Sequence, residues 1–174
     1  MGPRHATAIG GGLLAALCLV ACGEVIWIDP EVNYGDEELY VPHGDPAVEL
    51  GFYSEQLYEP LTEGGECFVV HGLQGGMWTM PAVRITGIAQ EAHIACTLTT
   101  AEGERVGITD EDVTFVLATD GWLEIQTYPI RVYRHPDAGA VEELFGEPGT
   151  LECSVVDSAG RGANTSMDIV FAQG

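Results

Sequence analysis

The feature that most constrains the fold of this chain is the recurrence of an apolar residue at every second position. In the clearest run, residues 92–99, the even-numbered positions hold Ala, Ile, Cys and Leu, whereas the odd-numbered positions hold His, Ala, Thr and Thr. Successive side chains of a β-strand point to opposite faces, so this alternation predicts a strand that is buried on one face only. The same period recurs at residues 113–117, 151–155 and 167–171.

Turns between these segments complete the prediction of an all-β fold. Further strands are expected at residues 67–70, 78–88 and 122–133, and Pro81 marks an edge or a bulge in the second of these. Only residues 138–145, before Gly146, have the pattern of a short helix. About seven or eight short strands spaced in this way predict an antiparallel β-sandwich. The expected turns contain Gly64-Gly65, Gly75-Gly76, Asp120-Gly121 and residues 158–162.

The last two apolar runs lie in GTLECSVVDSAGRGANTSMDIVF, residues 149–171. This stretch resembles the closing hairpin of immunoglobulin-like domains, in which a strand ending Cys-x-Val-x-Asp meets a tight Gly-containing turn and a returning strand. The resemblance implies an immunoglobulin-like β-sandwich in which Cys153 is the second cysteine of the bridge and Cys96 is its favoured partner. Cys67 remains an alternative partner, because the tryptophan expected soon after the first cysteine is missing and Trp122 follows only much later.

The N-terminus has the three zones of an export signal. Arg4 gives it a weak positive charge, residues 6–21 are uncharged and rich in Leu and Ala, and the zone ends in LVAC at residues 19–22. Since a membrane span needs about 20 apolar residues, this short segment is interpreted as a signal peptide. Its end resembles a lipobox, which implies cleavage before Cys22 and acylation of that cysteine. An ordinary secretory signal is the alternative.

Three parts are therefore expected along the chain. They are a lipoprotein signal peptide at residues 1–21, a lipidated N-terminus with an acidic tether at 22–46, and a β-sandwich domain at 47–174. Prolines at positions 30, 42 and 46 argue against a long helix in the tether. By analogy with lipoprotein sorting, Gly23 after the lipidated cysteine implies the outer membrane, on either its periplasmic or its surface face.

A second resemblance involves a series of small motifs before residue 77. Leu50-Gly51, Pro-Leu-x-x-Gly at residues 60–64 and Gln-Gly-Gly at 74–76 resemble a series in uncharacterised myxobacterial lipoproteins. That family implies a habitat but no activity. Many of its members have a histidine soon after the glycines, where this chain has Met77 and Trp78, so no metal role is carried over from it.

The charge of the chain limits its partners. It has 27 acidic residues against six basic ones, all arginine, and a formal net charge of −21. An acidic surface of this kind repels phosphate backbones, so no nucleic-acid partner is expected. The same charge permits a divalent cation or a basic partner, although a solvated acidic surface is the simpler explanation.

No arrangement of residues indicates catalysis. The chain lacks a Gly-x-Ser-x-Gly elbow, and its serines have no characteristic spacing to its histidines. We therefore expect a non-enzymatic envelope lipoprotein without a cofactor, whose partners are the membrane, through its lipid anchor, and an envelope protein. The expected binding loop contains Gln74, Gly75, Gly76 and Trp78, although its glycines are first of all suited to a turn with positive φ.

Metal binding is the alternative function, with no metal site as the primary expectation. Soft ligands for copper would be His71, Met77 and Met80, but the two methionines have opposite strand parity. Hard ligands for calcium would be Asp110, Glu111 and Asp112, with Asp120 across the sheet as a further candidate. Gap-filling methionines and solvated acidic turns are the simpler explanations of the two groups.

Overall fold

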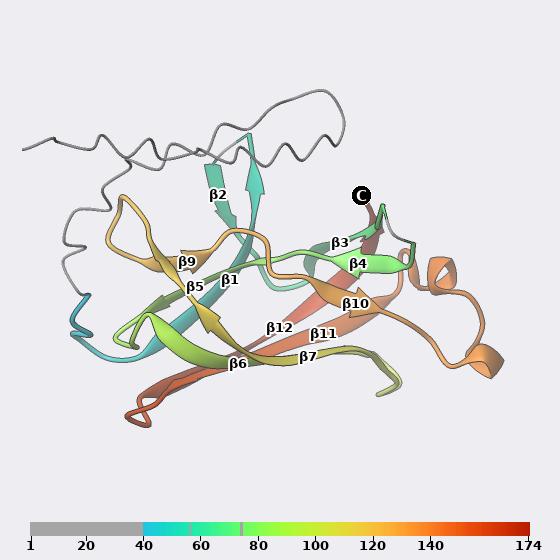
Figure 1. Cartoon of the computed structure of the whole chain (residues 1–174). Coiled ribbons are helices and arrows are strands. Elements are labelled where there is room, and N and C mark those ends of the chain that lie inside the picture. The colour runs from blue at the N-terminus through green and yellow to red at the C-terminus, as the bar shows by residue number, and fades with distance from the viewer. Residues whose placement is uncertain (1–39, 56, 74) are drawn as a thin grey trace, which may run out of the picture. The chain divides into compact units, whose positions relative to one another are not determined.

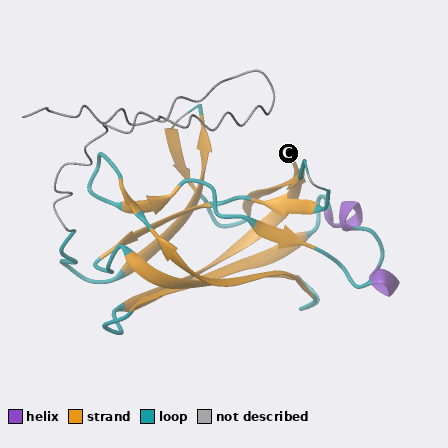
Figure 2. Cartoon of the chain, viewed as in Figure 1, coloured by secondary structure: helices purple, strands orange, loops and turns teal. Residues whose placement is uncertain are grey.

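A computed structural model describes residues 40–55, 57–73 and 75–174 of the chain. Several predicted features lie outside the described residues: the predicted signal peptide, the predicted lipidation site Cys22, most of the predicted tether, and Gln74. Within the described part the fold is all-β, with twelve strands in two sheets and two short 3₁₀ turns (Figures 1 and 2). The predicted fold class is therefore confirmed at the level of an all-β protein.

The first sheet has five strands in the order β2-β1-β5-β9-β8, and all its neighbouring strands are antiparallel. One face of it is apolar and packs into the core, where Leu50, Val83 and Ile85 are buried. The strands of this five-stranded sheet are β1 (Ala47–Ser54), β2 (Leu57–Pro60), β5 (Ala82–Thr86), β8 (Val116–Leu117) and β9 (Leu123–Ile125).

The second sheet closes into a barrel in the order β10-β4-β3-β12-β11-β6-β7. Closure occurs where Val132 of β10 pairs with Gly107 of β7, and β12 runs parallel to β3. The strands are β3 (Gly65–His71), β4 (Met77–Thr79), β6 (Glu91–Thr100), β7 (Arg105–Thr114), β10 (Ile130–Val132), β11 (Pro148–Asp157) and β12 (Gly162–Gln173).

The closed barrel differs from the plain sandwich that the sequence predicts, because three predicted strands each divide between the sheets. Residues 113–117 separate at Phe115 into the end of β7 and β8. Residues 78–88 separate into β4 and β5 at Pro81, and residues 122–133 separate into β9, which ends at Ile125, and β10, which begins directly after Pro129. Proline has no backbone N–H and interrupts a ladder. The segments around Pro81 and Pro129, where the chain passes from one sheet to the other, lie next to each other, since the amide of Tyr128 donates to the carbonyl of Pro81 at 2.8 Å.

The predicted helix at residues 138–145 is replaced by two 3₁₀ turns, Pro136–Ala138 and Val141–Leu144. Gly139, with a φ of 99°, separates them, and a continuous helix cannot pass through that backbone conformation. No helix in the described part of the chain is long and apolar enough to cross a membrane. The first two strands of the described chain, β1 and β2, occupy residues for which the sequence patterns predict no individual strand.

The predicted disulfide between Cys96 and Cys153 is present. The two cysteines are directly opposite on neighbouring strands β6 and β11, with their Cα atoms 4.1 Å apart. In immunoglobulin-like domains the bridge joins the two sheets, whereas here it joins two neighbouring strands of the same sheet. The alternative partner Cys67 is a free thiol in the core. Its burial raises its pKa to about 11, and its Sγ lies 3.3 Å from the Thr79 hydroxyl.

The turn between β11 and β12 is held by the buried carboxylate of Asp157. One of its oxygens accepts the backbone amides of Ala159 (3.0 Å) and Arg161 (2.9 Å), and the other accepts that of Ala89 (3.0 Å). Burial alone would raise the pKa of Asp157, but these three amides hold its pKa below the ordinary value of 3.8. Asp157 thereby ties the hairpin turn to the segment that precedes β6.

We expect Asp157→Asn to lower the free energy of unfolding by about 2 kcal/mol at neutral pH, because the amides lose a charged acceptor. The pKa of Asp157 is lower in the folded than in the unfolded chain, so this stabilisation exists above the ordinary value of 3.8 and disappears as the pH falls through the folded pKa. Urea unfolding of the original chain and of the variant, from neutral to acidic pH, measures the difference in their free energies of unfolding. A difference that did not shrink in acid would contradict this role.

Candidate functional site

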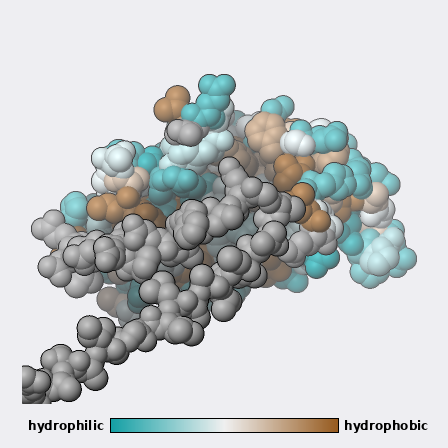
Figure 3. Space-filling model, turned by 45° about the horizontal axis from the view of Figure 1, so that its top comes forward, coloured by the Kyte–Doolittle hydropathy of each residue, from teal (hydrophilic) through white to brown (hydrophobic). Residues whose placement is uncertain are grey.

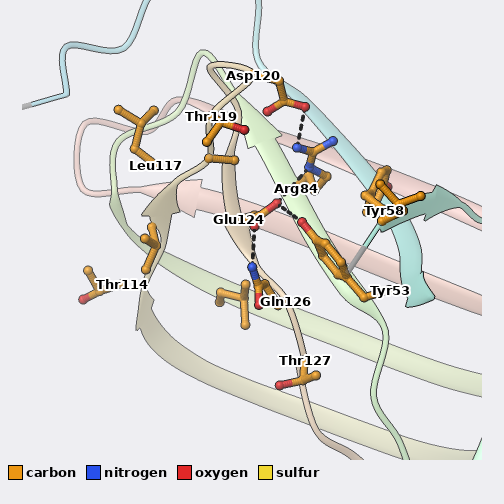
Figure 4. A pocket seen from close by; sticks show the side chains of 14 residues that line it. Tyr53, Tyr58, Arg84, Thr114, Leu117, Thr119, Asp120, Glu124, Gln126 and Thr127 are labelled. Atoms are coloured by element: carbon orange, nitrogen blue, oxygen red, sulfur yellow. Dashed lines mark hydrogen bonds and ion pairs between the residues drawn. The ribbon is translucent and has the colours of Figure 1, made fainter. Parts of the chain in front are cut away.

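An open pocket of about 860 Å³ lies on the outer face of the five-stranded sheet. The β1–β2 hairpin borders it on one side, and β8 with the loop that follows borders it on the other (Figure 4). Three apolar side chains at its border are mostly exposed to solvent: Leu57 (70%), Val116 (66%) and Leu117 (54%). Exposed apolar residues grouped around a hollow are typical of a contact surface.

The polar floor of the pocket results from the register of three neighbouring strands. Glu49 of β1 is directly opposite Arg84 of β5, and Arg84 is directly opposite Glu124 of β9. Opposed residues of adjacent strands project from the same face of a sheet. Because Val83 and Ile85 on either side of the arginine face the core, alternation turns the three charged residues toward the outer face.

Arg84 is enclosed by acidic and aromatic side chains. Its Nη2 lies 2.6 Å from the carboxylate of Asp120, and its Nε lies 3.1 Å from that of Glu124. The guanidinium stands 4.3 Å from the ring centre of Tyr58 and 5.7 Å from that of Trp122. The side chains of Arg84 and Glu124 are only 8% and 6% exposed, so this ion pair is shielded from solvent.

Both carboxylate oxygens of Glu124 have partners within the protein. The hydroxyl of Tyr53 donates to Oε2 at 2.5 Å, and the side-chain amide of Gln126 donates to Oε1 at 3.0 Å. In Figure 4 these contacts form one connected group with Arg84 on the floor of the pocket. A buried carboxylate that is paired in this way is held in one orientation.

The aromatic wall of the pocket requires a glycine in β1. A Cβ atom on Gly51 would lie 2.6 Å from the ring of Tyr58, so the glycine allows the ring to lie across the strand. The hydroxyl of Tyr58 is buried without a hydrogen-bond partner. Burial raises the pKa of this phenol, and the nearby carboxylate of Glu49 raises it further. Tyr58 therefore remains neutral beside Arg84.

The pocket has a surplus of negative charge. Among the lining residues, the two carboxylates of Asp120 and Glu124 face the single positive charge of Arg84, and Glu49 lies opposite Arg84 in the register of the sheet. The hydrogen bond from Arg84 lowers the pKa of Asp120, which keeps that half-exposed carboxylate ionised. The arrangement offers an apolar border and a negative potential, which together favour an amphipathic or cationic molecule over an anion.

The predicted binding loop lies elsewhere, between β3 and β4. Gly75 and Gly76 have φ values of 85° and 84°, as expected for a turn. The indole of Trp78 donates to the carbonyl of Gly75 (3.4 Å), and a Cβ on Gly72 would lie 2.6 Å from its Nε1. Trp78 thus supports the turn by packing on its backbone. None of these residues lines the pocket.

The structure separates the predicted calcium ligands. Asp110, Glu111 and Asp112 lie within β7 and not in a turn, and Asp120 is engaged by Arg84. Asp110 and Asp112 instead bracket His93, at 2.8 and 2.9 Å, and the hydrogen bond to Asp112 raises the pKa of that imidazole. Among the residues described, no three His, Cys, Asp or Glu side chains form a group that could hold a metal ion.

The predicted copper ligands do not share one environment. Met77 belongs to the hydrophobic core, whereas Met80 is more than a third exposed beyond the end of β4. His71 is exposed at the end of β3, opposite Met77 in the register of the two strands. For Met77 the explanation as a core residue is confirmed.

No protein-family model matches the chain, and no curated protein matches it.

Apart from Asp120, which was named only as a possible calcium ligand, the charged residues of the pocket were not predicted, although the sequence contains a signal for them. Arg84 stands in the centre of the apolar segment AVRIT, and Glu124 stands between Leu123 and Ile125. A single charge in the middle of a short apolar strand is costly to bury unless it is paired. Two such charges of opposite sign are therefore candidates for one buried ion pair.

Proposed function

We propose that this protein is an exported, lipid-anchored binding protein of a bacterial envelope, without catalytic activity, and that the pocket on the five-stranded sheet receives its partner. The observation that carries the binding function is the pocket itself, with three exposed apolar side chains around a buried, charged floor. Brown apolar patches interrupt the hydrophilic surface in Figure 3, but only at this pocket do exposed apolar residues border a buried ion pair among the pockets described.

The proposal of a non-enzymatic role is supported by the state of Glu124. A general base needs a free lone pair directed at its substrate. Both oxygens of Glu124 are instead engaged by Tyr53, Arg84 and Gln126. The carboxylate therefore serves to position its neighbours and to set the charge of the pocket.

The proposed anchor is supported by the sequence LVAC at residues 19–22. Several acyl chains on Cys22 would hold the chain at a bilayer, since each buried methylene contributes about 0.8 kcal/mol. A location at the outer membrane follows from Gly23 by sorting analogy. A distant relation to immunoglobulin-like domains is part of the same proposal, and the β11–β12 hairpin supports it.

The anchor is tested by Cys22→Ser. We expect this variant to accumulate as an unprocessed precursor and to take up no radiolabelled palmitate, because the acylated thiol is absent. Cys18→Ser is the matched control and should be processed and labelled like the original chain. Normal processing and labelling of Cys22→Ser would contradict the proposed anchor.

The binding function is tested by Leu117→Ser in the rim of the pocket. We expect this variant to retain less envelope protein than the original chain in affinity capture from envelope extracts, because it loses apolar contact area. Leu73→Ser removes a fully exposed leucine from the β3–β4 turn and should capture as the original chain does. Equal capture by all three chains would contradict a binding role for the pocket.

A further inference from the structure

We infer that the occupant of the pocket is an extended basic segment of another protein, which pairs with β8 and places a lysine or arginine side chain over Asp120 and Glu124. This inference rests on the proposed binding function and names the chemistry of the partner. Three features of the pocket lead to it: its charge, the form of its border and the free edge of β8.

The charge of the pocket excludes an anionic ligand. Arg84 is the only base among the residues that line it, and that side chain is 8% exposed and already paired with two carboxylates. No lining base is therefore free to hold a phosphate or a carboxylate. Asp120, in contrast, is 51% exposed, so one of its faces is open to an incoming cation. The formal charge of −21 on the whole chain also attracts cations and repels anions.

The border of the pocket fits a side chain with an apolar stem and a charged end. Leu57, Val116 and Leu117 offer apolar surface above a floor that holds carboxylates. Lysine and arginine bury their methylene stems against apolar surface while their charged ends reach polar partners. Arg84 shows this mode of contact inside the pocket, since it stacks on Tyr58 and pairs with Asp120 and Glu124.

The free edge of β8 provides the backbone contact for an extended segment. In the described sheet β8 is an edge strand, whose single neighbour is β9. The amide of Ala118, directly after β8, donates to the carbonyl of Trp122, directly before β9, at 2.7 Å. Because antiparallel strands direct alternate residues toward each neighbour, the backbone N–H and C=O of Leu117 point to the free edge. A peptide strand can add there by β-augmentation.

The side chains of such an added strand would be aligned with the charged residues on the floor of the pocket. Val116 is directly opposite Glu124, which is directly opposite Arg84. A residue of the added strand opposite Val116 would therefore project from the same face as these two residues. Its side chain would cross the exposed apolar border before its charged end reached the carboxylates, which selects a long basic residue over a short one.

The test is fluorescence anisotropy with the full chain in detergent and a short fluorescein-labelled peptide in which lysine and valine alternate. We expect this peptide to bind, and the same peptide with glutamate in place of lysine not to bind. Asp120→Asn should weaken binding about tenfold, because it removes a charge at the floor. Asp137→Asn removes the same charge from an exposed 3₁₀ turn and should leave the affinity unchanged.

A second variant, Val116→Ser, should also weaken binding of the peptide. It tests the same pocket independently if Asp120→Asn does not fold stably. Equal weakening by Asp137→Asn would overturn the inference, because the attraction would then come from the whole acidic surface. Spermidine that displaced the peptide at an equal concentration would overturn it in favour of a small cation. Binding of a neutral oligosaccharide but not of the peptide would also overturn it, while the proposed binding function, tested by Leu117→Ser, would stand.

Discussion

Replacing Arg84 by methionine is expected to lower the free energy of unfolding by about 3–5 kcal/mol, the cost of leaving a buried carboxylate without its partner. The side chains of Arg84 and Glu124 are 8% and 6% exposed, so water cannot replace the lost contact. Methionine keeps much of the apolar volume of the stem, which separates the loss of charge from the loss of packing. Urea unfolding followed by tryptophan fluorescence measures the effect.

A double substitution separates the ion pair from other causes. Arg84→Met with Glu124→Gln removes both charges and should restore most of the lost stability, because no buried charge is left unpaired and Asp120, the other partner of Arg84, is half exposed to solvent. Arg131→Met changes an exposed arginine on β10 and should alter stability by less than about 0.5 kcal/mol. If Arg84→Met unfolded at the same urea concentration as the original chain, the ion pair would not stabilise the pocket.

Removing the disulfide is expected to have an effect of similar size. Its cysteines are 57 residues apart in the chain, and closing a loop of that length restricts the unfolded state by about 4 kcal/mol. The double substitution Cys96→Ala with Cys153→Ala should therefore lower the free energy of unfolding by about 3–5 kcal/mol. The measurement is urea unfolding of both chains, with and without reductant.

The reductant provides the internal control for this result. Dithiothreitol should lower the unfolding midpoint of the original chain and leave that of the double variant unchanged. Cys67→Ala alters the buried free thiol next to Thr79, and this variant should still respond to reductant. A double variant that remained sensitive to reductant would show that another cysteine pair forms in solution.

Several strands were predictable because their signals are local. The strands β6 and β11 each bury every second residue along ten residues, and β12 buries Ile169 and Phe171 in the same alternation. Side-chain alternation along such a strand is visible in the sequence alone. The pairing of Cys96 with Cys153 was predicted from the resemblance of the closing hairpin. The position of this disulfide between adjacent strands was not predicted, because that position depends on which strand lies next to β11.

The pocket was not predictable in the same way. Its residues come from five separate segments of the chain: Tyr53 from β1, Tyr58 from β2, Arg84 from β5, Asp120 from the loop before β9 and Glu124 from β9. Short strands of two to five residues, such as β5, β8 and β9, carry too few positions for a clear period. Only the register between β5 and β9 places Arg84 opposite Glu124.

The sequence by itself determined that this is an all-β protein with half-buried strands and glycine-containing turns, because alternation and turn chemistry are properties of neighbouring residues. It also led to the prediction of a lipid anchor at Cys22, which stays a prediction. The tertiary structure alone decided that the second sheet closes into a barrel and that an ion pair lies under a pocket on the first. Both depend on contacts between distant segments, whose strand order and register result from the packing of the whole core.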